Sequence, residues 1–265
     1  MPEYTPKLNY KKCNYIAMNG KAHIHFQNGM KLEEVENATY LGGNINNEAG
    51  RIEELTNRIS KALVTCNKLE VFWHKTKCNY KWKLQVYNAI IVAQLTYGLN
   101  TLQLTPSLLA RLDAFQMRGL RYILGIEHSF YSHTTNEEVY HKANIALNKG
   151  EDLSLTWEEF IGANKIAQPK YVIKLNDYVM NQQSKALGHI IRADANDMMK
   201  RVTLDMDTLT QKEIPWQRRA GRPRVKWVEE NCNYIYNKLN GGYEYDSLNP
   251  AHKANIKENA INRNF

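Results

Sequence analysis

The sequence predicts a mainly α-helical protein with a small β element at its N-terminus, an α+β fold. Short runs suited to strands, separated by Asn-Gly turn signals, occupy residues 13–42. From residue 48 onward, apolar residues recur at steps of three and four, which is the period of an amphipathic helix. A hydrophobic fraction of 43% over 265 residues is enough to bury a core. We expect a β-hairpin element in residues 1–47, a helical bundle in 48–150, and further helices with a basic linker and a terminal helix in 151–265.

Two Asn-Gly pairs define the expected N-terminal strands. Asn19-Gly20 and Asn28-Gly29 are typical of the tight turns that join hairpin strands. Strands are therefore expected at residues 13–18, 21–27 and 39–41. Gly42-Gly43 follows the last strand and is expected to end it, because glycine frees the backbone from the extended conformation.

Three long helices are expected between residues 50 and 125. The first carries one apolar stripe from Ile52 to Leu69, and the second spans residues 79–97 with Trp82 in its stripe. The third begins at Thr105-Pro106 and stops at Gly125. Three amphipathic helices joined by short links form a bundle.

Shorter helices are expected in the second half of the chain. Their apolar residues predict helices at 157–166, 177–192 and 224–239, and an earlier one starts at residues 135–138, where acidic residues suit a helix N-terminus. Residues 194–223 are polar and interrupted by proline and glycine, so we expect an extended connection there.

Several sequence blocks, taken in order, resemble one known family. They resemble the region after the catalytic palm in reverse transcriptases of non-LTR (LINE-type) retrotransposons. The resemblance implies that residues 1–47 correspond to the end of a polymerase palm, 48–150 to a thumb, and 151–265 to the post-thumb region. The blocks are Tyr40-Leu41-Gly42-Gly43, Tyr97-Gly98, Leu120 to Ile126, Leu187 to Arg192 and Gly221 to Trp227.

The catalytic residues of that family are missing from these blocks. Reverse transcription requires aspartates that hold two magnesium ions, and the family's Tyr-x-Asp-Asp motif does not occur in this sequence. Asp205 and Asp207 form a D-x-D, with Asp194 and Asp197 nearby, but all four lie in the polar connection. The resemblance would place the catalytic part before residue 1. We expect no enzyme activity, no catalytic or metal-binding residues, and no cofactor.

A basic segment near the C-terminus is the first candidate nucleic-acid contact. Five cations lie within nine residues, and arginines form bidentate contacts with phosphate. A solvated linker with a basic bias is the alternative. The candidate residues are Arg218, Arg219, Arg222, Arg224 and Lys226.

A lysine-rich turn before the second helix is the next candidate. Lys75, Lys77, Lys81 and Lys83 surround it, and Trp73, Tyr80 and Trp82 are interleaved with them. Such residues could contact phosphates and stack on unpaired bases. The alternative is a solvated loop with Trp82 in the core. Arg118 and Arg121 of the third helix would extend the surface.

Charge and cysteine content limit the possible partners and compartments. The net charge of +8 favours nucleic acid or an anionic membrane surface. No stretch approaches the ~18 apolar residues of a membrane-spanning helix. Four cysteines without a C-x-x-C pair indicate a reducing intracellular compartment, which leaves mitochondrial, cytoplasmic and nuclear locations open.

The resemblance and the charge together predict a function. We expect a non-catalytic nucleic-acid-binding protein, derived from a retroelement, that contacts RNA (ribosomal RNA included) or the DNA backbone. It would be a structural component of a ribonucleoprotein such as a ribosome, beside neighbouring proteins. Two alternatives remain open: the thumb of a split reverse transcriptase whose palm is on another chain, or a purely structural subunit of a protein complex.

Overall fold

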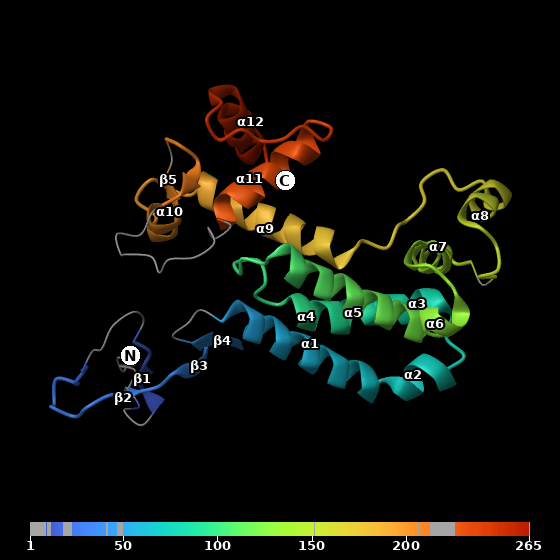
Figure 1. Ribbon diagram of the computed structural model, residues 1–265, viewed down its shortest axis with the longest axis horizontal. Coiled ribbons are helices and arrows are strands. Elements are labelled where there is room, and N and C mark those ends of the chain that lie inside the picture. The colour runs from blue at the N-terminus through green and yellow to red at the C-terminus, as the bar shows by residue number, and fades with distance from the viewer. Residues whose placement is uncertain are drawn as a thin grey trace, which may run out of the picture. The chain divides into compact units, whose positions relative to one another are not determined.

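The computed structural model describes residues 9, 12–17, 23–40, 42–46, 50–150, 152–205, 207–212 and 226–264. It is mainly helical with a few short strands, four of them near the N-terminus, which confirms the predicted fold class (Figure 1). The chain divides into two compact units, residues 1–57 and 58–265. The boundary expected near residue 150 lies inside the second unit.

Short strands form the first unit. β1 (Asn14–Tyr15) pairs in parallel with β2 (Glu33–Glu34), and β3 (Asn37–Tyr40) pairs antiparallel with β4 (Gly43–Asn46). Gly42 has a φ of +80°, a conformation that reverses the chain between β3 and β4. The strand therefore ends before Gly42 as predicted, but it is not the last strand of the sheet, because Gly43 begins β4.

The region of the second Asn-Gly pair forms the predicted turn. Gly29 has a φ of +83°, and the Phe26 N–H donates to the Met30 carbonyl at 2.8 Å. The expected strand at 21–27 is present, in its described part, as a single bridge between His25 and Lys31. Asn19-Gly20 lies outside the described residues.

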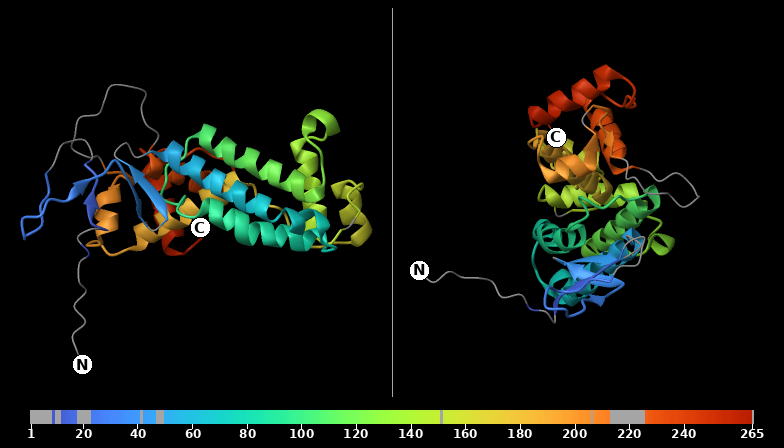
Figure 2. Two further views of the ribbon diagram at one scale, coloured as in Figure 1. Left: turned by 90° about the horizontal axis from the view of Figure 1, so that it is seen from below. Right: turned by 90° about the vertical axis from the view of Figure 1, so that its left-hand side faces the viewer.

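The three predicted long helices are present, and the second is composite. It has an α-helical start, a π-helical middle and an α-helical end, and the buried Tyr87 ring at the π-helical start lies against Gly119 of the third helix. In the left view of Figure 2 the three long helices of the bundle run side by side. The elements are α1 (Arg51–Lys68), α2 (Glu70–Lys75), α3 (Tyr80–Val86), η2 (Tyr87–Val92), α4 (Ala93–Thr96) and α5 (Pro106–Leu124).

Helices α7 (Asn136–Leu147) and α9 (Leu175–Arg192) pack against α5. Buried amides tie these elements together. Gln116 of α5 accepts hydrogen bonds from the Leu175 N–H and the Tyr140 hydroxyl, both at 2.9 Å. Gln183 of α9 donates to the carbonyls of Leu99 and Leu102 at 2.9 and 2.8 Å. The backbone between α4 and α5 is therefore fixed by α9.

Helix starts follow their sequence signals. The Thr135 hydroxyl oxygen accepts from the Glu138 N–H, and the Glu138 carboxylate accepts from the Thr135 N–H, which is a complete capping box. Thr156 and Glu159 form a second capping box at the start of α8 (Trp157–Asn164). A short helix, α6 (Ser129–Ser132), precedes α7.

The C-terminal part of the second unit has its own core against α9. The extended connection predicted for 194–223 is wrong in its described part, which forms a helix and a hairpin. Trp227, Val228 and Ile235 of the next helix are buried in this core with Leu187 and Ile256. The elements are α10 (Met198–Thr203), β5 (Leu204–Asp205), β6 (Thr210–Gln211), α11 (Trp227–Leu239) and α12 (Pro250–Ile261), of which α12 was not predicted.

Candidate nucleic-acid interface

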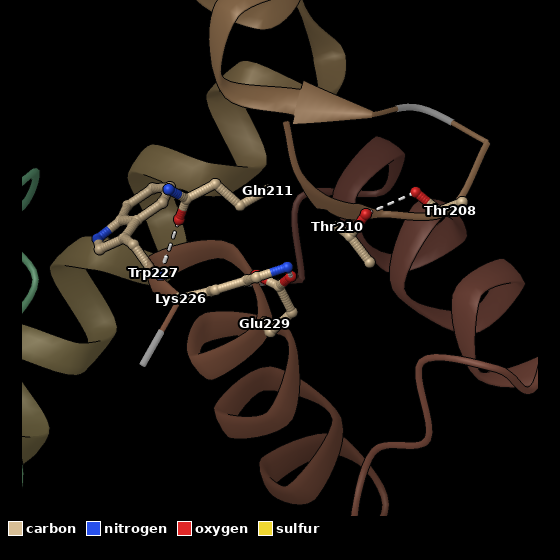
Figure 3. A network of polar contacts seen from close by, with 6 residues as sticks. All are labelled: Thr208, Thr210, Gln211, Lys226, Trp227 and Glu229. Atoms are coloured by element: carbon tan, nitrogen blue, oxygen red, sulfur yellow. Dashed lines mark hydrogen bonds and ion pairs between the residues drawn. The ribbon is translucent and has the colours of Figure 1, made fainter. Parts of the chain in front are cut away.

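The basic C-terminal segment is described only at its end. Lys226 immediately precedes α11, and its Nζ lies 3.4 Å from Glu229 Oε1 (Figure 3). The Trp227 N–H donates to Gln211 Oε1 at 3.0 Å, so β6 anchors the start of α11. Because a carboxylate partly neutralises Lys226, it is a weaker phosphate ligand than the sequence suggested. Arg218, Arg219, Arg222 and Arg224 lie outside the described residues.

The lysine-rich turn between α2 and α3 is exposed as predicted. Lys75 and Lys77 are exposed and Lys81 is half-buried. The turn has a defined backbone, because the Thr76 hydroxyl donates to the Phe72 carbonyl and Asn79 caps α3 by accepting from the Trp82 N–H at 3.0 Å. Because the backbone of the turn is already held in place, it loses less conformational entropy when these lysines bind a ligand.

Lys83 is buried, and its predicted phosphate contact is wrong. The side chain is 7% exposed, and its Nζ donates to the Trp73 carbonyl, in the last turn of α2. The carbonyls of the last helical turn have no partner within the helix, and a cation there is favourable. Lys83 therefore links the end of α2 to α3.

Trp82 faces solvent and does not lie in the core. The sequence placed it in the apolar stripe of the second helix, yet it is 61% exposed. Trp73 of α2, which precedes the turn, is buried instead. Its Nε1–H donates a hydrogen bond to the Cys66 carbonyl at 2.9 Å. The helix starts within one residue of the prediction, at Tyr80, but its buried face is the one that carries Leu84, Tyr87 and Ile91 and not the one that carries Trp82.

The two arginines of α5 have different roles. Arg118 is exposed. Arg121 is 8% exposed and donates to the carbonyls of Glu127 at 3.1 Å and Thr134 at 2.7 Å. Both ends of the segment that contains α6 are held in this way. The predicted nucleic-acid contact of Arg121 is therefore wrong, and that of Arg118 remains a prediction.

An aromatic contact joins the end of α2 to α5. The His74 ring meets the Tyr122 ring edge-on with centroids 4.4 Å apart. Tyr122 follows Arg118 by one helical turn, so Arg118 and Lys75 belong to adjoining surface. Burial and the nearby Glu70 carboxylate raise the pKa of the Tyr122 hydroxyl. An acidic side chain therefore lies close to Tyr122, among these basic residues. No sequence pattern predicts the His74–Tyr122 contact, which depends on tertiary packing.

Three exposed lysines extend this surface along α1 and α2. Lys61, Lys68 and Lys75 are each seven residues apart, and only Leu69 separates the two helices. A seven-residue step returns to nearly the same helix face and advances about 10 Å. Among the described residues, none of these side chains forms an ion pair. We use the name basic surface for six cations of α1, α2, the turn after α2, α3 and α5, of which five are exposed and Lys81 is half-buried: Lys61, Lys68, Lys75, Lys77, Lys81 and Arg118.

The aspartates of the polar connection have local structural roles. Asp205 accepts the N–H groups of Asp207 and Thr208 at 2.9 and 3.1 Å, which shapes the turn between β5 and β6 and lowers the pKa of the Asp205 carboxyl. Asp197 caps α10, and Asp194 accepts the Asn196 N–H at 2.8 Å. In the described ranges, no three His, Cys, Asp or Glu side chains gather as a metal ion would require.

No protein-family model, curated protein or solved structure matches this chain. None of the described helices is both long and apolar enough to cross a lipid bilayer.

Proposed function

We propose that this chain binds RNA through the phosphate backbone, without catalysing a reaction, as a structural component of a ribonucleoprotein. The observation that carries the proposal is the basic surface, a set of exposed and half-buried cations on α1, α2, α3, α5 and the turn after α2 that form no ion pair among the described residues. Such cations attract a polyanion, whereas cations paired with carboxylates largely do not.

The form of this surface favours a nucleic-acid backbone. Lys61 and Lys68 lie seven residues apart on α1, Lys75 ends α2, and Lys77 and Lys81 follow in the turn and at the start of α3. A series of such point charges suits a chain of phosphates and carries no base information. The resemblance of the sequence blocks to reverse transcriptases supports RNA as the polyanion, and the four arginines at 218–224 would add contacts of the same kind.

Binding to a labelled, mixed-sequence single-stranded RNA, followed by fluorescence anisotropy, tests the proposal. A triple variant with Lys75→Ala, Lys77→Ala and Lys81→Ala removes three charges from the basic surface. The matched control carries Lys170→Ala, Lys174→Ala and Lys185→Ala, three exposed lysines elsewhere in the second unit.

We expect the first triple variant to bind RNA more weakly regardless of RNA sequence, and the control to bind like the wild type. Equal losses in both variants would mean that net charge alone matters, and the assignment of the basic surface would then be rejected. If a palm-bearing chain co-purified with the native protein, the non-catalytic part of the proposal would be rejected.

A further inference from the structure

Two adjacent aromatic residues, Phe130 and Tyr131, are exposed on the short helix α6. Phe130 is 75% exposed and Tyr131 72%, and their rings meet edge-on with centroids 5.2 Å apart. Of the phenylalanines that the structure describes, Phe130 alone is exposed. Rings that remain in water gain little from the hydrophobic effect, so packing of the core does not explain these two residues.

The segment that carries the two rings is nevertheless held in place. The Arg121 guanidinium donates to the carbonyls of Glu127 and Thr134, which lie before and after α6, at 3.1 and 2.7 Å. Within the segment, Nδ1 of His128 accepts the Phe130 N–H at 3.2 Å. A backbone that is already fixed loses less entropy when its side chains bind a ligand.

This aromatic pair lies at the same end of the helical bundle as the lysine-rich turn (Figure 1). Lys75 directly follows His74, and the His74 ring lies 4.4 Å from the Tyr122 ring. The residue before Tyr122 is Arg121, which holds both ends of the α6 segment. Two neighbouring residues of α5 therefore connect α6 with the end of α2, and a nucleic acid bound to the basic surface would pass close to α6.

We propose that Phe130 and Tyr131 stack on unpaired bases of the RNA whose phosphates bind the basic surface. This inference rests on the proposed function and narrows its ligand to single-stranded RNA. Aromatic side chains stack on every base, because every base has a π-face. Bases in a duplex are stacked on one another, so only single-stranded regions offer free faces.

The chemistry of the α6 segment is the reason for choosing bases as the occupant. Residues 128–136 contain no carboxylate, and the neighbouring surface is basic, which suits a polyanion. Polar side chains that can form hydrogen bonds, His128, Ser129 and His133, are exposed beside the two rings. Single-stranded RNA is recognised by stacking combined with hydrogen bonds to base edges, whereas the centre of a protein interface is more apolar.

Binding to two short single-stranded oligonucleotides, followed by fluorescence anisotropy, tests this inference. Both have the same number of phosphates, but one carries bases and the other is abasic. We expect the wild type to bind the RNA with bases more tightly, by about fivefold or more. The double variant with Phe130→Ala and Tyr131→Ala should bind both equally. Tyr243→Ala, at a 74% exposed tyrosine between α11 and α12, is the control and should keep the wild-type preference.

A second double variant separates stacking from general apolar contact. Phe130→Leu with Tyr131→Leu keeps apolar side chains but removes both rings, so it should lose the preference as the alanine variant does. Circular dichroism should show wild-type helicity in both variants, because the replaced side chains are exposed. A leucine variant that kept the preference for bases would overturn the assignment of stacking.

The two oligonucleotides also distinguish this inference from the proposed function. The variant with Lys75→Ala, Lys77→Ala and Lys81→Ala should bind both more weakly and keep the preference for bases. A wild type that bound both oligonucleotides equally, or an alanine variant of the pair that kept the preference, would overturn base stacking and leave the phosphate contacts intact. A wild type that bound neither would reject the proposed function together with this inference.

Discussion

Lys83 is a basic residue that stabilises the fold instead of binding a ligand. Its ammonium group satisfies the Trp73 carbonyl at the end of α2, and it also lies 5.6 Å from the centre of the Tyr80 ring. Lys81, two residues earlier, is half-buried and makes no such contact with a backbone carbonyl among the described residues. Lys83 therefore has a structural role, whereas Lys81 has the proposed binding role.

The change Lys83→Met keeps the apolar stem of the side chain and removes its charge. The Trp73 carbonyl loses its partner, and an unsatisfied buried polar group costs about 1–3 kcal/mol. We expect urea denaturation to show a free energy of unfolding lower by that amount. Lys81→Met is the control and should leave stability unchanged. If Lys83→Met were as stable as the wild type, the link between α2 and α3 would have no energetic importance.

The burial of individual cations could not be predicted from the sequence. Arg121 is buried because the carbonyls of Glu127 and Thr134 converge on its guanidinium, and Thr134 is 13 residues away. Arg58 of α1 is 7% exposed and lies over the Tyr97 ring. Local pattern shows which residue types are basic, whereas the acceptors that bury them come from distant segments.

At the scale of elements, the composite second helix depends on a close approach to α5. A Cβ added at Gly119 would lie 2.6 Å from the Tyr87 hydroxyl oxygen and 2.8 Å from Cε2 of the same ring. Burial raises the pKa of this hydroxyl far above its ordinary value. The ring therefore has little room to move, and only glycine fits at this position of α5.

Gly119→Ala should consequently be destabilising although alanine favours helices. Overpacking of a core costs about 1–3 kcal/mol, and we expect thermal and urea denaturation to show a loss in that range. Gly162→Ala in α8 is the matched control, because a Cβ there meets nothing within 4 Å. The control should be neutral or slightly stabilising, since alanine has the higher helix propensity. A stable Gly119→Ala variant would contradict the close packing.

Elements with a clear local signal were predicted, and those stabilised by tertiary contacts or single side chains were not. The helical period gave α1, α5 and α9, and the Thr135 signal gave the start of α7. The π-helical turn was not predicted, since it starts where Tyr87 packs on Gly119. Asp197 and Asp205 stabilise α10 and the β5–β6 hairpin through hydrogen bonds that a polar composition does not reveal.

Across the second unit, charged and uncharged surfaces are segregated along the chain. The basic surface draws most of its cations from residues 61–81, and a stretch without charged residues follows from Leu84 to Ala110. We propose a polyanion as the ligand of the basic surface.

The salt dependence of RNA binding tests the central proposal most directly. Six phosphate contacts on single-stranded RNA, at about 0.7 each, predict a slope of about −4 for log K against log salt concentration. The variant lacking Lys75, Lys77 and Lys81 should have a slope shallower by about 2, and the control with Lys170, Lys174 and Lys185 replaced should keep the wild-type slope. A wild-type slope near zero, or equal slopes in all three proteins, would contradict RNA binding by the basic surface.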